Sequence, residues 1–149
     1  MKQPRFMLAA PSSGSGKTMI TCWFLELLRS EGHPVSFKCG PDYIDPMFHK
    51  RVLGVDSYNL DIFMCGKSGV KKELSRHGNT CDLAVIEGVM GYYDGLAGIS
   101  TDASAYDVAR ITKTPAVLIV NAKGMSLSAA AFVKGFVEYR EDSQIRGVI

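Results

Sequence analysis

Short apolar runs alternate with amphipathic segments along the chain. The strand candidates are residues 6–10, 35–38, 83–86 and 116–120. The first helical pattern spans residues 19–31, and its expected buried face consists of Ile20, Trp23, Phe24, Leu27 and Leu28. Strand runs that alternate with helical patterns are typical of a mostly parallel sheet with helices on both faces. The pattern therefore predicts a three-layer α/β fold.

Two more helices and a further strand are expected in the second half of the chain. One helix is predicted from Asp102 to Thr112, with Thr101 as its N-cap. Ser126 is expected to cap the other, whose predicted buried stripe is Ala129, Phe132, Val133, Phe136 and Val137. Residues 147–149 resemble the start of a strand. We therefore expect a fold truncated at its C-terminal strand, in a fragment of a longer protein.

Length and composition indicate one globular domain, residues 1–149. The net charge is +2 without a basic run, so we expect no nucleic-acid partner. No stretch approaches the ~20 apolar residues that a bilayer requires. The first ten residues run into a strand without the apolar core of a signal peptide. The four cysteines form no CxxC pair. These features predict a cytoplasmic protein with no membrane association.

A glycine-rich segment, APSSGSGKT at 10–18, lies between the first strand and the first helix. Backbone N–H groups in such a loop bind phosphate oxygens, helped by the helix dipole. Lys17 would reach the β- and γ-phosphates and Thr18 would ligate Mg²⁺. The other expected phosphate contacts are Ser13, Gly14, Ser15 and Gly16. Pro11 replaces the first glycine of the usual pattern, and an ordinary turn is the alternative. The flanking strand and helix favour a nucleotide site.

Charged residues follow two of the predicted strands. Glu87 is the first charge after the third apolar run, where a glutamate can hold Mg²⁺ directly or through water. Lys38 ends the second strand, near the expected phosphates. Asp42 and Asp45 follow it and are candidates for the Mg²⁺ site or for substrate contact. A structural role for Asp45 stays open, because an aspartate before Pro46 is also a common helix start.

A glycine-interrupted segment at 88–95 directly follows Glu87. It contains Asp94, and an aspartate followed by glycine is a common turn signal. Alternatively, the segment is a mobile loop in which Asp94, Tyr92 and Tyr93 bind a second substrate. The residues alone leave both interpretations open.

Together these motifs resemble the N-terminal, ATP-binding domain of the cobyrinic acid a,c-diamide synthases of cobalamin biosynthesis. The matching segments are APSSGSGKT at 10–18, FKCGPDYIDPMFH at 37–49, NLDIFM at 59–64, VIEGVMGYYDG at 85–95 and AKGMSLSAAA at 122–131. The resemblance implies a P-loop NTPase-type fold. It also implies ATP-dependent amidation of the a and c acetates of a corrin, through an acyl phosphate.

The resemblance carries residue roles with it. Thr18, Asp42, Asp45 and Glu87 correspond to nucleotide–metal residues, and Asp94 to a residue tied to amidation. Lys17 and Asp94 are therefore the expected catalytic residues, with ATP and Mg²⁺ as cofactors and a corrinoid as substrate. In this family a C-terminal glutaminase domain with a cysteine nucleophile supplies the ammonia. None of the four cysteines lies in that motif, so we expect the synthetase domain alone; a homodimer stays open.

Three alternatives share parts of this pattern. Nickel-sirohydrochlorin a,c-diamide synthase differs only in its substrate. Dethiobiotin synthetase lacks the GPDYID and GYYDG segments. A partitioning-type switch ATPase would have a lysine near the start of the phosphate loop, where this chain has Pro11, Ser12 and Ser13. A nucleotide-binding fragment without catalysis is a further possibility for the chain alone.

Overall fold

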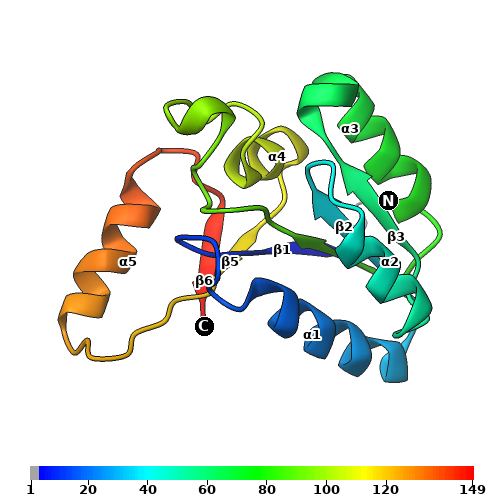
Figure 1. The fold of residues 1–149 in the computed structure, drawn as a ribbon, viewed down its shortest axis with the longest axis horizontal. Helices are drawn as coiled ribbons and strands as arrows, with labels where there is room; N and C mark the ends of the chain where they lie inside the picture. Colours follow the sequence, from blue (N-terminus) through cyan, green and yellow to red (C-terminus); the bar gives the residue numbers. More distant parts are fainter. Residues whose placement is uncertain (1–3) are drawn as a thin grey trace.

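The computed structural model describes residues 4–149, so the first three residues of the N-terminal segment lie outside it. Six strands form one parallel sheet in the order β3-β2-β4-β1-β5-β6 (Figure 1). They are β1 (Arg5–Ala9), β2 (Pro34–Cys39), β3 (Ser57–Leu60), β4 (Leu83–Glu87), β5 (Ala116–Leu118) and β6 (Ile145–Val148). The helices are α1 (Lys17–Glu31), α2 (Ile44–Arg51), α3 (Ile62–Gly78), α4 (Ala105–Thr112), α5 (Ser128–Glu138) and the short 3₁₀ helix η1 (Leu96–Gly98). The predicted α/β fold is confirmed.

Helices cover both faces of the sheet, with α1 and α2 on one face and α3 and α4 on the other (Figure 1). On the first face, Val85 of β4 packs in a core with Leu25 of α1. On the second, the next strand residue, Ile86, belongs to a core with Val70 of α3 and Ala109 of α4. Successive strand residues thus point to opposite, covered faces, which explains why β4 is a continuous apolar run.

The strand order brings the polar segments of the chain to one edge of the sheet. β1 lies between β4 and β5, and β2 pairs with the other side of β4. The carboxyl ends of β1, β2 and β4 are therefore neighbours. In open parallel sheets, ligands bind outside the carboxyl ends of strands, where the strand order reverses. The segments that follow these three strands all start at this edge.

The buried face of α1 agrees with the expected one in part, because Ile20, Phe24 and Leu28 are partly buried and pack against the core. Trp23 and Leu27 are 61% and 48% exposed, although both were expected in the buried face. The buried residues are instead Lys17, Thr21 and Leu25, which are four residues apart and lie on one side of the helix. Lys17 is directed into the phosphate loop, and of the expected face only Trp23 and Leu27 remain outside the core.

The hydrophobic pattern of the sequence did not predict β3 or α3. β3 is an edge strand, SYNL, of which only the leucine is fully buried, so it lacks a continuous apolar run. α3 is interrupted at Gly66, which has a φ of 67°, so the helical periodicity breaks there. β6 begins at Ile145 and pairs with β5, so this strand starts earlier than the expected segment at 147–149.

Two helix caps differ from the predicted ones. α4 begins at Ala105, and its cap is Ser104, whose Oγ accepts from the Asp107 N–H at 3.1 Å. Thr101 contributes only its carbonyl, which accepts from Ser104 Oγ at 2.7 Å. The helix cannot start earlier because Ala103 has a φ of 58°, outside the right-handed helical region. Ser126 makes no cap hydrogen bond; α5 begins after Leu127.

The expected buried stripe of α5 is only partly buried. Phe132 and Val137 are 38% and 37% exposed, and α5 has no fully buried residue. Phe136 alone from this stripe packs against the main core. Phe132 and Phe136 instead line a hollow between α5 and residues 93–102. Within residues 4–149, no helix combines the length and apolar character needed to cross a membrane.

The two serines provide a matched test of capping. We expect Ser104→Ala to lower the free energy of unfolding by about 1 kcal/mol, because it removes the cap of α4. Ser126→Ala should change it by less than about 0.5 kcal/mol, because its hydroxyl caps nothing. Urea denaturation of both variants measures the difference. Equal losses of stability would contradict the assignment.

Candidate functional site

The segment between β1 and α1 forms an open loop at the carboxyl edge of the sheet. Gly14 and Gly16 have φ values of 72° and 81°, which glycine adopts without strain. A hollow of about 500 Å³ lies against this loop. Its walls include the predicted phosphate contacts Ser13, Gly14, Gly16, Lys17 and Thr18. Ser15 does not line the hollow; its hydroxyl donates to the Ser12 carbonyl at 2.9 Å.

Lys17 places a buried ammonium group in this loop. Its Nζ donates to the carbonyl of Ser12 at 2.9 Å and to that of Met90 at 2.6 Å. Burial lowers the pKa of Lys17 and the nearby charge of Lys38 lowers it further, while Glu87 and Asp94 act in the opposite direction. Neutral carbonyls are its hydrogen-bond partners, so the cation remains available to an anion that enters the hollow.

A polar network connects β2, β4, α1 and α2. Thr18 Oγ1 donates to Glu87 Oε1 at 2.6 Å and to Asp45 Oδ2 at 3.3 Å. Lys38 Nζ donates to the same two oxygens, at 2.8 Å and 2.6 Å. The Asp42 carboxylate lies 3.7 Å from Lys38. Four of the predicted site residues, Thr18, Lys38, Asp45 and Glu87, are thus in direct contact, with Asp42 at the margin.

The charges of this network depend on one another. Burial disfavours the Lys38 cation, but Glu87 and Asp45 more than offset this, so the pKa of Lys38 is raised. Burial also acts to raise the pKa of Asp45, but its hydrogen bond with Lys38 outweighs this and lowers the pKa. The pKa of Glu87 is raised because burial outweighs Lys38 and Thr18. The Lys38 ammonium is therefore the shared partner of several carboxylates. Because the carboxylates outnumber this cation, the network favours binding of a further positive charge.

The donor set suits Mg²⁺ in part. Glu87 Oε2 is buried and has no hydrogen-bond partner among the described residues, so this oxygen has unused bonding capacity. Thr18 and Asp45 supply further oxygen donors next to it. No group of three or more His, Cys, Asp or Glu residues within 4–149 forms a metal site by itself. Mg²⁺ commonly has only one or two protein ligands, with water and phosphate oxygens completing its shell.

In the segment after β2, Asp42 rather than Asp45 accepts from the backbone at the start of α2. Asp42 Oδ1 accepts from the N–H groups of Ile44 and Asp45, at 2.9 Å and 3.3 Å, where α2 begins. Asn59 fixes the same segment, because its Nδ2 donates to the carbonyls of Gly40 and Asp42 at 2.8 Å and 2.6 Å. Asp45 lies inside the helix and is not its N-cap. Its carboxylate is free to bond Lys38.

His49 is a site residue that the sequence only hinted at. It is fully buried, and its Nδ1 lies 3.0 Å from Ser36 Oγ and 3.4 Å from Ser57 Oγ. Its Nε2 lies 3.8 Å from Glu87 Oε2, and neither of these atoms has a hydrogen-bond partner among the described residues. The available signal was its position four residues after Asp45, which places both on one face of α2.

Asp94 closes a turn beside the phosphate loop. Its Oδ2 accepts from the Gly91 N–H at 3.0 Å, and its own N–H donates to the Gly91 carbonyl at 3.0 Å. The Tyr92 N–H donates to the Ala10 carbonyl at 2.8 Å, which ties this turn to the loop. A Cβ at Gly91 would clash with Asp94 and with the Pro11 carbonyl. The expected turn therefore holds the Asp94 carboxylate next to the candidate phosphate site.

Burial of His49 gives the protein a testable pH dependence. Burial lowers its pKa below the ordinary value of 6.5, so the unfolded chain takes up this proton at a higher pH than the folded chain. The stability contribution of His49 is therefore present above about pH 6.5 and is lost as the pH falls through this window. We expect the unfolding free energy of the wild type to fall more steeply below pH 6.5 than that of His49→Gln.

Urea denaturation between pH 7.5 and pH 5.5 measures this difference. His33→Gln is the matched control, because the His33 side chain is exposed and should leave the steepness unchanged. The same steepness in the wild type and in His49→Gln would contradict the assignment.

Comparisons with known proteins place these motifs in a family context. No protein-family profile matches the chain. The cobyrinate a,c-diamide synthase of Saccharolobus solfataricus is 46% identical over 145 residues, 97% of this chain and 33% of that protein. The hydrogenobyrinate a,c-diamide synthase of Streptomyces coelicolor is 46% identical over 147 residues, 98% of this chain and 30% of that protein. The chain thus spans about a third of the length of these curated relatives.

Solved structures agree on the fold. The signal recognition particle receptor FtsY of Elizabethkingia anophelis, in complex with GDP, matches with a TM-score of 0.63 and 15% identity, over 95% of this chain and 48% of that one. The 54 kDa signal recognition particle protein of Aeropyrum pernix matches with a TM-score of 0.60 and 17% identity, over 99% and 35%.

The fold is that of the P-loop NTPases. Over almost its whole length the chain is homologous to the N-terminal part of the cobyrinate a,c-diamide synthases, as its motifs suggested.

Proposed function

We propose that residues 1–149 are the ATP-binding synthetase domain of a cytoplasmic cobyrinate a,c-diamide synthase. In this role the chain binds ATP, transfers its γ-phosphoryl group to an acetate carboxylate of the corrinoid and so prepares that carboxylate for amidation. The observation that carries the proposal is the contact network of Thr18, Lys38, Asp45 and Glu87 beside the phosphate loop. It occurs in a chain 46% identical to a protein of that name.

The first step makes a poor electrophile reactive. An oxygen of the substrate carboxylate attacks the γ-phosphorus of ATP, the bond to the β–γ bridging oxygen breaks, and ADP leaves. Such transfers depend on positioning and on neutralising negative charge around the phosphates. Lys17 supplies a buried cation at the loop, and the backbone around Gly14 and Gly16 is open to phosphate oxygens. Lys38 adds a second cation, already oriented by Glu87 and Asp45.

Mg²⁺ would be held at the same network. Thr18 Oγ1 and the carboxylates of Glu87, Asp45 and Asp42 are its candidate ligands, directly or through water. When bound, the ion would contribute positive charge at the phosphate oxygens. The chain itself orients these oxygens through Lys38, whose hydrogen bonds hold Glu87 and Asp45 together.

The second step forms the amide. Ammonia attacks the carbonyl carbon of the acyl phosphate, the bond from carbon to the phosphate oxygen breaks, and the nitrogen loses a proton. We assign that proton to Asp94, whose charge influences Lys17 and whose turn adjoins the phosphate loop. The ammonia would come from a glutaminase domain outside this chain, because none of its four cysteines lies in a glutaminase motif.

The test is amidation with ammonium as the nitrogen source. We expect cobyrinic acid, incubated with the protein, ATP, Mg²⁺ and ammonium, to gain one or two amides, detected by mass spectrometry. Omitting ATP should abolish the product, and glutamine should not replace ammonium. Absence of any ATP-dependent product from this chain would overturn the proposal that these residues are a sufficient synthetase domain.

Two variants separate the proposed roles. Lys17→Ala should lower the amidation rate at least about a hundredfold, because it removes a cation from the site of charge development. Asp94→Asn should also lower amidation but leave the affinity for MgATP unchanged, because asparagine can still accept from the Gly91 N–H. Lys71→Ala, at an exposed position on α3, is the matched control. Normal turnover in Lys17→Ala, or lost nucleotide binding in Asp94→Asn, would refute the roles.

A further inference from the structure

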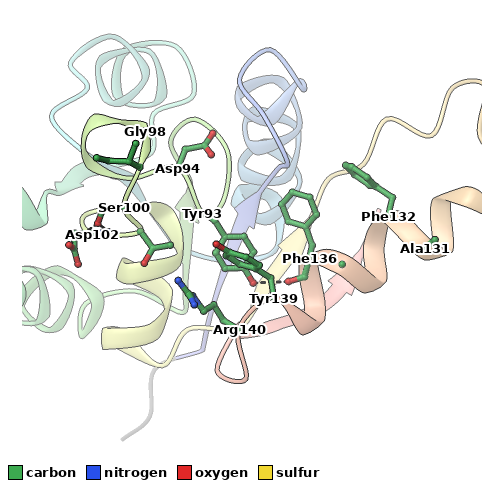
Figure 2. A pocket seen from close by; sticks show the side chains of 13 residues that line it. Tyr93, Asp94, Gly98, Ser100, Asp102, Ala131, Phe132, Phe136, Tyr139 and Arg140 are labelled. Atoms are coloured by element: carbon green, nitrogen blue, oxygen red, sulfur yellow. Dashed lines mark hydrogen bonds between the residues drawn. The ribbon is translucent and has the colours of Figure 1, made fainter.

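A second hollow lies beside the phosphate site, between α5 and the segment 93–102. Its volume is about 780 Å³, in the upper part of the range of roughly 300–1,000 Å³ found for small-molecule sites. Figure 2 shows loop residues Asp94, Gly98, Ser100 and Asp102 on the side of this space opposite to α5. Phe132 and Phe136, two residues of the predicted apolar stripe of α5, line this hollow.

The α5 side of the hollow is an aromatic wall. The rings of Tyr93 and Tyr139 are 4.9 Å apart, and those of Tyr93 and Phe136 are 5.8 Å apart and stacked. Tyr93 is fixed because its hydroxyl donates to the Phe136 carbonyl at 2.6 Å. Tyr139 and Phe132 remain 58% and 38% exposed. A rigid set of exposed rings suits a large, flat and partly apolar ligand.

Arg140 adds a cation at one end of this wall. Its guanidinium carbon lies 4.7 Å from the centre of the Tyr139 ring. Among residues 4–149, no carboxylate forms an ion pair with it. On the opposite side, Asp94 and Asp102 are acidic, and Asp102 is bonded to Ser100 Oγ at 2.8 Å. A ligand with several carboxylates would therefore direct one of them to Arg140, since a guanidinium matches a carboxylate in geometry and charge.

One short segment separates the two hollows. Val89 and Met90 line the phosphate hollow, whereas Tyr93 and Asp94 line the second one. Lys17 bonds the Met90 carbonyl, and the charge of Asp94 acts on Lys17. A ligand in the second hollow can thus extend a group past Asp94 toward the phosphate loop. The two hollows are placed like neighbouring sites for two reactants.

We propose that the second hollow is the acceptor site, an inference that rests on the proposed function. The macrocycle lies against Tyr139 and the adjoining rings, and Arg140 binds a carboxylate that does not react. The reacting carboxylate then passes Asp94 and meets the γ-phosphate near Lys17. Arg140 and Tyr139 are therefore specificity residues for the acceptor and have no part in nucleotide binding.

The test is calorimetric titration of cobyrinic acid into the protein in the presence of Mg²⁺ and a non-hydrolysable ATP analogue. We expect Arg140→Ala to weaken binding at least tenfold, Arg140→Lys to weaken it less, and Tyr139→Ser to weaken it severalfold. Arg76→Ala and Trp23→Ser, at exposed positions on α3 and α1, should match the wild type. The fully esterified form of cobyrinic acid should bind the wild type and Arg140→Ala equally, because it offers Arg140 no carboxylate.

Separate titrations with the ATP analogue distinguish the possible failures. Unchanged cobyrinic acid binding in Arg140→Ala and Tyr139→Ser, with normal nucleotide binding, would overturn the acceptor site and leave the proposed function intact. Weaker nucleotide binding in these variants would identify the hollow as part of the nucleotide site and also overturn the inference. Loss of both nucleotide binding and ammonium-dependent amidation in the wild type would refute the proposed function itself.

Discussion

The arrangement of the site depends on one buried ammonium group. Lys38, the last but one residue of β2, has a side chain 6% exposed, and it bonds Glu87 at the end of β4 and Asp45 on α2. Removing the Lys38 ammonium would leave the fully buried Glu87 and the neighbouring Asp45 without their shared cation, which is usually far costlier than the pair is favourable. The bonds to Lys38 therefore fix the relative positions of two strands and a helix. Thr18 joins the same oxygens and brings in the start of α1.

Much of this could be read from the sequence because local signals agreed with the topology. The strands at β1, β2, β4 and β5 were apolar runs, and a parallel sheet aligns their carboxyl ends, where the charged residues follow. That logic places Lys17, Thr18, Lys38 and Glu87 together from the sequence alone. Asp42, Asp45 and Asp94 were candidates from their positions after the strands, and the family resemblance assigned their roles, since the local sequence left a structural role open for Asp45 and Asp94.

Other features were decided by contacts between distant segments. His49 was one histidine among three in the sequence, and only the packing of α2 against Ser36 and Ser57 makes it a neighbour of Glu87. Asn59 lies in an edge strand without an apolar signature. The apolar residues of α5 have the periodicity of a buried helix face. Periodicity alone does not show whether that face packs against the protein core or lines an open hollow. The cap of α4 moved to Ser104 because the backbone at Ala103 excludes an earlier start.

The hydrogen bond from Lys17 to the Met90 carbonyl has a consequence for how the two hollows communicate. A phosphate that recruits the Lys17 ammonium competes with this carbonyl for the same protons, so the segment between the hollows has different partners before and after a phosphate arrives. Any change that this makes to the affinity of the second hollow has an equal reciprocal effect on the first, because linkage between equilibrium binding sites is symmetric. A single backbone carbonyl therefore couples the affinities of the two hollows, whichever reactant binds first.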